Sequence, residues 1–152
     1  MDKIRKENRY KRILNQIKKL IPKTTDPIAK MSTIAAILHH KFDYFFWTGF
    51  YRLIDGELIV SCYQGGVACL ILTKHIGVCW AAIDEEKTQI VPDVHKFDGH
   101  IVCDSRSTSE IVVPIFKDNV IVAVLDVDSK ELDSFDEIDA KYLEKIVRMI
   151  FS

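Results

Sequence analysis

The strongest constraint on the fold is a pair of apolar, β-branched segments, residues 110–116 and 120–128, which are separated only by Lys117-Asp118-Asn119. β-Branched residues favour strands, and a short connection that contains Asp and Asn favours a tight turn. Two such strands form a hairpin. The chain is therefore predicted to contain an antiparallel sheet.

A second hairpin is predicted earlier in the chain. Residues 45–53 are rich in aromatic side chains and typical of a strand, Asp55-Gly56 is a hairpin signal, and residues 58–63 supply the returning strand. By contrast, residues 92–109 show no sustained periodicity and are rich in Asp, Ser, His and Gly. This segment is predicted to be a long functional loop.

Helical spacing of apolar residues marks both ends of the chain. Residues 1–21 carry eight Lys and Arg against two acids, a net charge of +6. These cations are predicted to form the solvated face of an amphipathic helix, and a basic arm for nucleic acid is the alternative. Asp26-Pro27 predicts the start of a second helix, and residues 77–83 are predicted to form a short helix. Ser134-Phe135-Asp136-Glu137 is predicted to be a capping box at the start of the C-terminal helix.

Hairpins between terminal helices indicate the α+β class, with an antiparallel sheet and the N- and C-terminal helices packed on one face. This is the layout of a GAF or PAS domain. A chain of 152 residues suits one domain, with residues 1–25 as a basic helix and connector and residues 26–150 as the core. No apolar run spans a bilayer and the net charge is −1, so we expect a cytoplasmic protein that binds neither membrane nor nucleic acid.

Four cysteines stand at positions 62, 69, 79 and 103, without a Cys-x-x-Cys pair. In a reducing cytosol such cysteines are buried apolar residues, metal ligands or a redox-active set, and composition does not distinguish these roles. Cys103 lies in the predicted functional loop beside imidazoles and hydroxyls, where a thiolate can reach a small ligand. It is therefore a candidate nucleophile, and a small residue that anchors the loop is the alternative.

Three carboxylates are predicted to converge near one end of the second hairpin. Asp126 and Asp128 alternate within an apolar strand, so both point to one face of the sheet, and Glu110 opens the partner strand. Like charges in a partly dry site raise one another's pKa, so one acid can stay protonated while the others bind a cation. The alternative is that the two aspartates are solvated at the strand end.

Two aromatic residues, Trp47 and Tyr51, are four apart in a predicted strand and share one face. Their rings are predicted to wall a pocket for a methyl-sulfur group. Core packing explains the same pattern equally well.

Seven short segments carry the most specific information, and they include three of the cysteines. They are Trp47-Thr48-Gly49-Phe50-Tyr51, Gln64-Gly65-Gly66-Val67-Ala68-Cys69, Gly77-Val78-Cys79, Pro92-Asp93-Val94-His95, Gly99-His100-Ile101-Val102-Cys103-Asp104-Ser105, Ser109-Glu110-Ile111-Val112-Val113-Pro114 and Leu125-Asp126-Val127-Asp128-Ser129. In this order the segments closely resemble the GAF-domain free methionine-(R)-sulfoxide reductases, over about residues 26–150.

The resemblance implies roles for the cysteines. Cys103 would attack the sulfoxide sulfur and become a sulfenic acid, and Cys69 would resolve that acid as a redox-active disulfide, with thioredoxin as the reductant. Cys79 matches a third family cysteine with a role in binding or alternative resolution. Cys62 matches nothing in the family pattern and is predicted to be structural. No cofactor is implied.

The resemblance also implies a pocket for free methionine sulfoxide. Glu110, Asp126 and Asp128 match the carboxylates that hold the substrate ammonium and help to protonate its oxygen, and Trp47 and Tyr51 match the pocket aromatics. Members of the family resemble homodimers, so a homodimer is expected.

One departure from the family is Trp80, which stands where the family usually has Gly after Gly77-Val78-Cys79. A bulky indole at the start of a helix is expected to narrow the pocket or to reshape its carboxylate-binding end.

Two other functions compete with the reductase hypothesis. One is a GAF sensory module that binds a small ligand or senses oxidants without turnover. The other is a metal site built from His95, His100, Cys103 and Cys79, although their separations do not match a Cys-x-x-Cys zinc framework.

Overall fold

The computed structural model describes residues 1–99 and 103–152, and these form one six-stranded sheet with the strand order β3-β2-β1-β6-β5-β4. Every neighbouring pair of strands is antiparallel. The strands are β1 (Trp47–Ile54), β2 (Glu57–Gln64), β3 (Ile71–Leu72), β4 (Gln89–Val91), β5 (Ser109–Lys117) and β6 (Val120–Ser129). Both predicted hairpins are confirmed.

The two hairpins close on the same kind of turn. Asp55 and Gly56 join β1 to β2 with φ angles of 52° and 79°, and Asp118 and Asn119 join β5 to β6 with φ angles of 51° and 66°. A two-residue turn with positive φ at both central positions matches the right-handed twist of the flanking strands, and Asp, Asn and Gly are the residues that tolerate this conformation. Local sequence thus sets the register of both hairpins.

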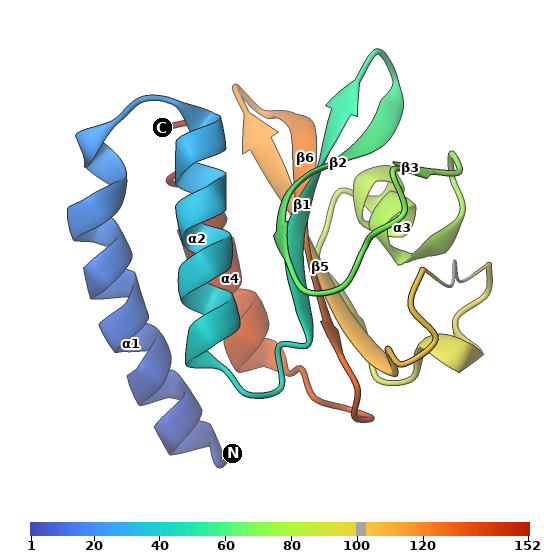
Figure 1. Ribbon diagram of the computed structural model, residues 1–152, viewed down its shortest axis with the longest axis horizontal. Coiled ribbons are helices and arrows are strands. Elements are labelled where there is room, and N and C mark those ends of the chain that lie inside the picture. Colours follow the sequence, from blue (N-terminus) through green and yellow to red (C-terminus); the bar gives the residue numbers. More distant parts are fainter. Residues whose placement is uncertain (100–102) are drawn as a thin grey trace.

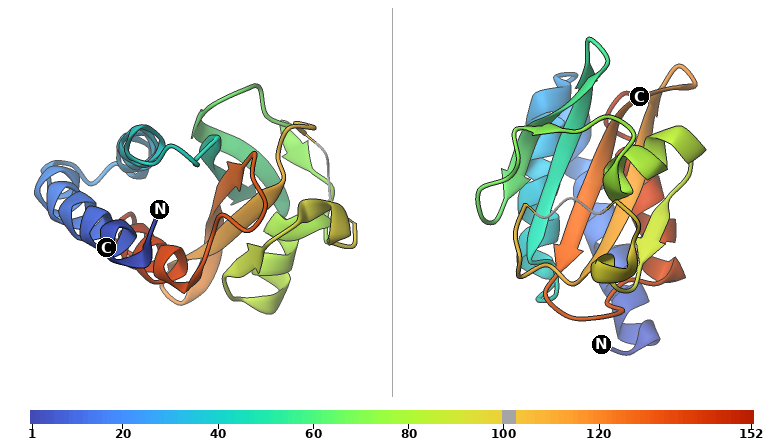
Figure 2. Two further views of the ribbon diagram at one scale, coloured as in Figure 1. Left: turned by 90° about the horizontal axis from the view of Figure 1, so that it is seen from below. Right: turned by 90° about the vertical axis from the view of Figure 1, so that its right-hand side faces the viewer.

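Helices cover both faces of the sheet unequally (Figures 1 and 2). α2 (Pro27–Lys41) and α4 (Glu137–Val147) pack on one face, and α1 (Lys3–Leu20) lies on the same side and packs against these two helices, with the 3₁₀ turn η1 (Ile21–Lys23) between α1 and α2. α3 (Gly77–Glu85), η2 (Val94–Lys96) and their connecting loops lie on the other face. The expected α+β fold with terminal helices on one face is confirmed, and none of the described helices has the length and apolar content that crossing a membrane requires.

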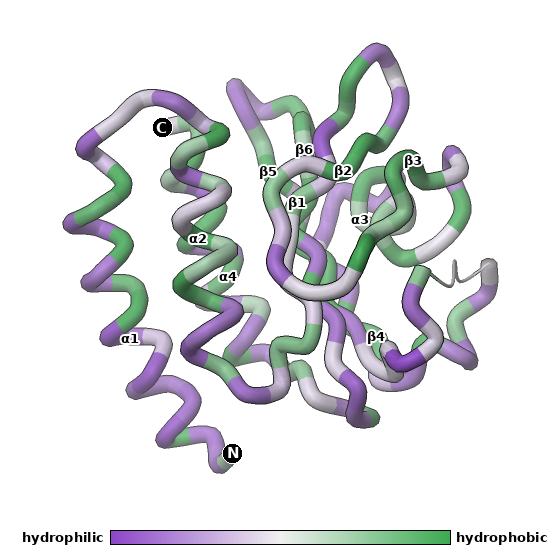
Figure 3. The backbone as a smooth tube through the Cα atoms, in the orientation of Figure 1, coloured by the Kyte–Doolittle hydropathy of each residue, from purple (hydrophilic) through white to green (hydrophobic). Residues whose placement is uncertain are grey.

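Alternation along the strands creates two separate apolar clusters. On β5, Ile111 and Val113 point into the larger cluster beneath the three helices, whereas Val112 points into a smaller cluster beneath α3. The helices contribute their apolar faces to the larger cluster and keep hydrophilic faces outside (Figure 3). Consequently, the face of the sheet beneath α1, α2 and α4 is filled by the main apolar core, and the opposite face is available for a binding site.

The first helix departs from the sequence prediction at Lys6. All eight cations of residues 1–21 were expected on a solvated face. Lys6 is instead only 5% exposed, and its Nζ lies 2.7 Å from Asp139 Oδ2 and 3.2 Å from Asp136 Oδ2. Asp139 is fully buried and also accepts hydrogen bonds from the hydroxyls of Tyr10 (2.6 Å) and Tyr44 (2.8 Å). A buried charge needs such partners, so tertiary contact overrides the helical pattern here.

The predicted capping box at Ser134 is wrong by two residues. The N-cap of α4 is Asp136, whose side chain accepts from the backbone of Asp139, while the Asp139 carboxylate accepts from the Asp136 backbone N–H at 2.9 Å. Ser134 instead contacts the Ser129 hydroxyl at 2.7 Å. Asp139 therefore serves both the helix start and the ion pair with α1.

We expect Asp139→Asn to lower the free energy of unfolding by about 3 kcal/mol, since it removes the nearer and more deeply buried of the two carboxylates that pair with the Lys6 ammonium. Urea denaturation followed by circular dichroism measures the change. Glu137→Gln is the matched control, because Glu137 begins the same helix and pairs with Lys3, but both side chains are largely exposed. Equal midpoints for the two variants would contradict a structural role for the buried pair.

Candidate active site

A pocket opens on the sheet face that carries α3, between the ends of β1, β5 and β6, the N-terminal end of α3 and the loop that follows residue 102. Its walls come from segments far apart in the sequence. Seven of the eight predicted site residues line it: Trp47, Tyr51, Cys79, Cys103, Glu110, Asp126 and Asp128. The eighth, Cys69, is linked to the pocket covalently.

A disulfide joins Cys69 to Cys103, with their Cα atoms 5.6 Å apart and a sequence separation of 34. Cys103 is exposed and lines the pocket, whereas Cys69 is half-buried in the loop after β2. The other two cysteines are unbonded. Because Cys103 is exposed and lines the pocket, its sulfur is accessible to a small ligand and to an external thiol.

The strand register brings the three carboxylates together. Glu110 lies opposite Asp128 in the β5–β6 pairing, and Asp126 lies one alternation further along the same face of β6. Glu110 and Asp126 are each only 5% exposed. Oδ1 of Asp126 is fully buried and has no hydrogen-bond partner among the described residues.

Burial and mutual repulsion favour the protonated form of these acids. Burial raises the pKa of Glu110 well above its ordinary value, and the charges of Asp126 and Asp128 raise it further. The pKa of Asp128 rises for the same reasons, with burial again the largest cause and Asp126 the next. No Lys, Arg or His is found among the described residues that line the pocket. The site is therefore built to hold a proton or a cationic ligand.

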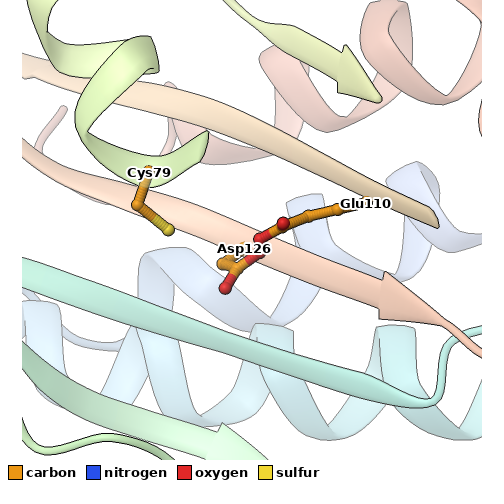
Figure 4. Close-up of side chains that lie close together, drawn as sticks. All are labelled: Cys79, Glu110 and Asp126. Carbon is orange, nitrogen blue, oxygen red and sulfur yellow. The ribbon is translucent and has the colours of Figure 1, made fainter. Parts of the chain in front are cut away.

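Cys79 projects from α3 toward the same carboxylates (Figure 4). It is 5% exposed, and burial, followed by the charges of Asp126 and Glu110, raises the pKa of its thiol well above the ordinary value. A protonated thiol is a weak hydrogen-bond donor and a poor nucleophile. Of the two roles expected for Cys79, this environment favours binding over alternative resolution.

The aromatic wall is a stack on the β1 end of the pocket. The Trp47 ring lies 5.9 Å from the Tyr51 ring and 5.2 Å from the Tyr63 ring, centroid to centroid. Trp47 Nε1 donates a hydrogen bond of 3.0 Å to the Gly66 carbonyl, which fixes the indole against the loop that carries Cys69. Gly49 is required between the two wall residues, because a Cβ there would overlap the Trp47 ring.

Asp104 lines the pocket and is held by Arg106, which lies outside the lining, and the sequence reasoning assigned a role to neither residue. The Arg106 guanidinium donates to both carboxylate oxygens of Asp104 at 3.0 and 2.8 Å, and its Cζ lies 4.7 Å from the Phe46 ring centroid. Hydrogen bonds from Arg106 lower the pKa of Asp104 to about 2. The Asp104 carboxylate also accepts a hydrogen bond from the Arg106 backbone N–H, two residues later. This contact forms a local turn that an Asp side chain favours. This turn holds the segment directly after Cys103.

Trp80 does not narrow the pocket, contrary to the sequence expectation. The indole is 4% exposed within the smaller apolar cluster, donates to the Leu72 carbonyl at 3.3 Å, and lies 4.8 Å from the His75 ring. It is not one of the residues that line the pocket. Successive helical residues point about 100° apart, so Cys79 faces the site while its neighbour points away.

The alternative metal site with histidines is not assembled in the part of the chain that the structure describes. His95 contacts Asp93 through Nδ1 at 3.1 Å and does not line the pocket with Cys79 and Cys103. His100 lies outside the described residues.

Comparisons with known proteins agree with this geometry. The GAF domain family model matches residues 31–150. GAF domain-containing protein A of Dictyostelium discoideum is 47% identical over 95% of this chain and 92% of its own length. The free methionine-R-sulfoxide reductase of Escherichia coli is 37% identical over 83% of this chain and 76% of its own length. The X-ray structure of the free methionine-R-sulfoxide reductase from Neisseria meningitidis, in complex with its substrate, matches with a TM-score of 0.89 and 39% identity, over 93% of this chain and 86% of that chain.

The family model covers every strand of the sheet and the cysteines at the pocket, and the relatives from Dictyostelium discoideum and Escherichia coli cover most of the chain. The chain therefore belongs to the GAF domain family and, within it, to the free methionine-R-sulfoxide reductases.

Proposed function

We propose that this protein reduces free L-methionine-(R)-sulfoxide to methionine, with Cys103 as nucleophile, Cys69 as resolving residue and thioredoxin as reductant. The observation that carries the proposal is the Cys69–Cys103 disulfide at the opening of a pocket whose buried acids have no cationic partner among its described lining residues. The reductases of Escherichia coli and Neisseria meningitidis support the choice of substrate through their similarity.

The pocket offers a separate contact for each end of the substrate. The buried oxygens of Asp126 and Glu110 accept hydrogen bonds from the α-ammonium, and the ammonium offsets their charge. The stacked rings of Trp47 and Tyr51 provide a polarisable wall for the methyl-sulfur end. Burial, followed by the charge of Asp126, raises the pKa of the Tyr51 phenol, so this wall remains neutral.

The first chemical step needs a nucleophile and an acid. In the reduced protein, the Cys103 sulfur attacks the sulfoxide sulfur while the protonated carboxyl group of Asp128 donates to the sulfoxide oxygen. That oxygen ends on Cys103 as a sulfenic acid, and methionine leaves with its sulfur reduced by two electrons. The raised pKa of Asp128 keeps the required proton available at neutral pH.

The second step regenerates the Cys103 thiol. The Cys69 thiol attacks the Cys103 sulfenic acid, a disulfide forms and water leaves. Thioredoxin then exchanges its dithiol for this disulfide, which regenerates both thiols and oxidises thioredoxin. Cys103 is exposed and Cys69 is half-buried, so a protein thiolate has a route to the bond.

We expect Cys103→Ser to abolish methionine formation with every reductant, because no other thiol is placed for attack. Cys79 is buried, Cys62 packs against the core under the helices, and Cys69 is not among the residues that line the pocket. Methionine released from the resolved R epimer measures the effect. Cys62→Ser is the matched control and should retain full activity. Retained activity in the Cys103 variant would remove Cys103 from the nucleophile role.

A different result is expected for Cys69→Ser. Attack by Cys103 precedes resolution, so this variant should release one stoichiometric burst of methionine and then stop in the presence of thioredoxin. Rapid-quench measurement of methionine against enzyme concentration detects the burst. If the burst disappears together with steady turnover, Cys69 is needed for binding or attack, and the resolving role fails.

We expect kcat/KM for N-acetylmethionine sulfoxide to be about a hundredfold lower than for the free amino acid. Acetylation removes the ammonium and leaves a buried carboxylate unpaired, at a cost of about 3 kcal/mol. In Asp126→Asn this preference should shrink, because the variant removes one of the charges that the ammonium offsets. Comparable values for the two substrates in the wild type would exclude an ammonium site at these carboxylates.

A further inference from the structure

Three potential metal ligands meet at the base of the pocket, beyond the chemistry assigned to the reductase. A ligand atom of each of Cys79, Glu110 and Asp126 lies within 4.8 Å of the others, and all three side chains are buried. They come from α3, β5 and β6, and the packing of α3 on the β5–β6 hairpin brings Cys79 to the two acids. The Cys79 sulfur and the two carboxylates converge in Figure 4.

Two observations indicate that this cluster accepts a cation. Asp126 is 95% buried, since its exposed fraction is 5%, and its Oδ1 has no hydrogen-bond partner in the described chain although the residue lines the pocket. In addition, a third acid, Asp128, lies opposite Glu110 in the strand pairing, so three carboxyl groups line the pocket. None of the described pocket-lining residues carries a positive charge that could offset them. A positive ligand is therefore the natural partner for the unpaired oxygen.

The donor set selects the kind of cation. Calcium and magnesium prefer oxygen ligands alone, and copper(I) and iron–sulfur clusters prefer several soft ligands. One sulfur with two carboxylate oxygens suits zinc, which binds Cys, Asp and Glu in tetrahedral sites. Three protein ligands leave the fourth position of the tetrahedron for water on the side of the pocket.

We propose that Zn²⁺ binds in this pocket through Cys79 Sγ and one carboxylate oxygen each of Glu110 and Asp126. The ion occupies the oxygens that the proposed function assigns to the substrate ammonium, so metal and substrate exclude one another. Zinc binding itself is independent of that function, whereas the exclusion rests on it.

Cobalt(II) is a suitable probe because it takes the same ligands as zinc and gives a thiolate-to-metal charge-transfer band. The experiment uses the oxidised wild-type protein, in which the disulfide removes Cys69 and Cys103 as ligands and leaves Cys62 and Cys79 as the unbonded thiols. We expect one equivalent of cobalt(II) to produce the band and one equivalent of Zn²⁺ to remove it. A wild-type spectrum without a thiolate band would overturn the site, and this readout needs no variant to fold.

Matched variants then identify the sulfur ligand. Cys62→Ser should keep the band and the zinc affinity, because Cys62 packs against the core on the helical side of the sheet. Cys79→Ser should lose the band and bind zinc at least about tenfold more weakly, since even loss of an outer-shell partner commonly costs this much. Asp126→Asn should weaken zinc binding similarly, with circular dichroism to verify folding. Unchanged affinity in both the Cys79 and Asp126 variants would show surface binding only and would overturn the proposal.

The exclusion is tested separately with free methionine sulfoxide added to the cobalt-loaded oxidised protein. Glycine at the same concentration is the control, because both compounds chelate cobalt through an amino group and a carboxylate. We expect methionine sulfoxide to remove the band at lower concentration than glycine does. Equal displacement by methionine sulfoxide and glycine would overturn the overlap between the metal site and the substrate site. If the thiolate-to-cobalt band is nevertheless present in the wild type, the metal site stands and the proposed ammonium site is wrong.

Discussion

The antiparallel pairing of β5 with β6 is the constraint on which the rest of the structure depends. Side chains alternate along each strand, so the register that puts Ile111 and Leu125 beneath the helices also puts Glu110 and Asp126 on the opposite face. A shift by one residue would place acids in the apolar core and apolar residues in the pocket. Core stability and the chemistry of the site therefore constrain the same register.

Two buried aspartates show how this protein separates structure from function. Asp139, at the helical side of the sheet, is fully buried but accepts from the Lys6 ammonium, two tyrosine hydroxyls and a backbone N–H. Asp126, on the other side, is almost as buried but keeps one oxygen without a partner in the described chain. A satisfied buried acid stabilises the fold, whereas an unsatisfied one costs free energy until a ligand supplies the missing donor or charge. The proposed ammonium and zinc sites both follow from this difference.

The four cysteines occupy three environments, and each environment limits what the sulfur can do. Cys69 and Cys103 lie on loops at the pocket opening and form a disulfide. Cys79 is buried beside carboxylates that raise the pKa of its thiol, which disfavours nucleophilic attack but places a soft ligand beside hard ones. Cys62 packs against the larger apolar cluster on the far side of the sheet. Reactivity therefore follows position in the fold and not the residue type.

The sequence by itself determined the hairpins, the terminal helices and the α+β class, because turn residues such as Asp118-Asn119 and the apolar periodicities act over a few positions. It also indicated that Asp126, Asp128 and Glu110 share one face, since alternation in a strand is local. Only the tertiary structure decided the burial of Lys6, the direction of Trp80 and the approach of Cys79 to the acids. These features depend on contacts between elements far apart in the chain, where burial and ion pairing outweigh the local pattern that a sequence displays.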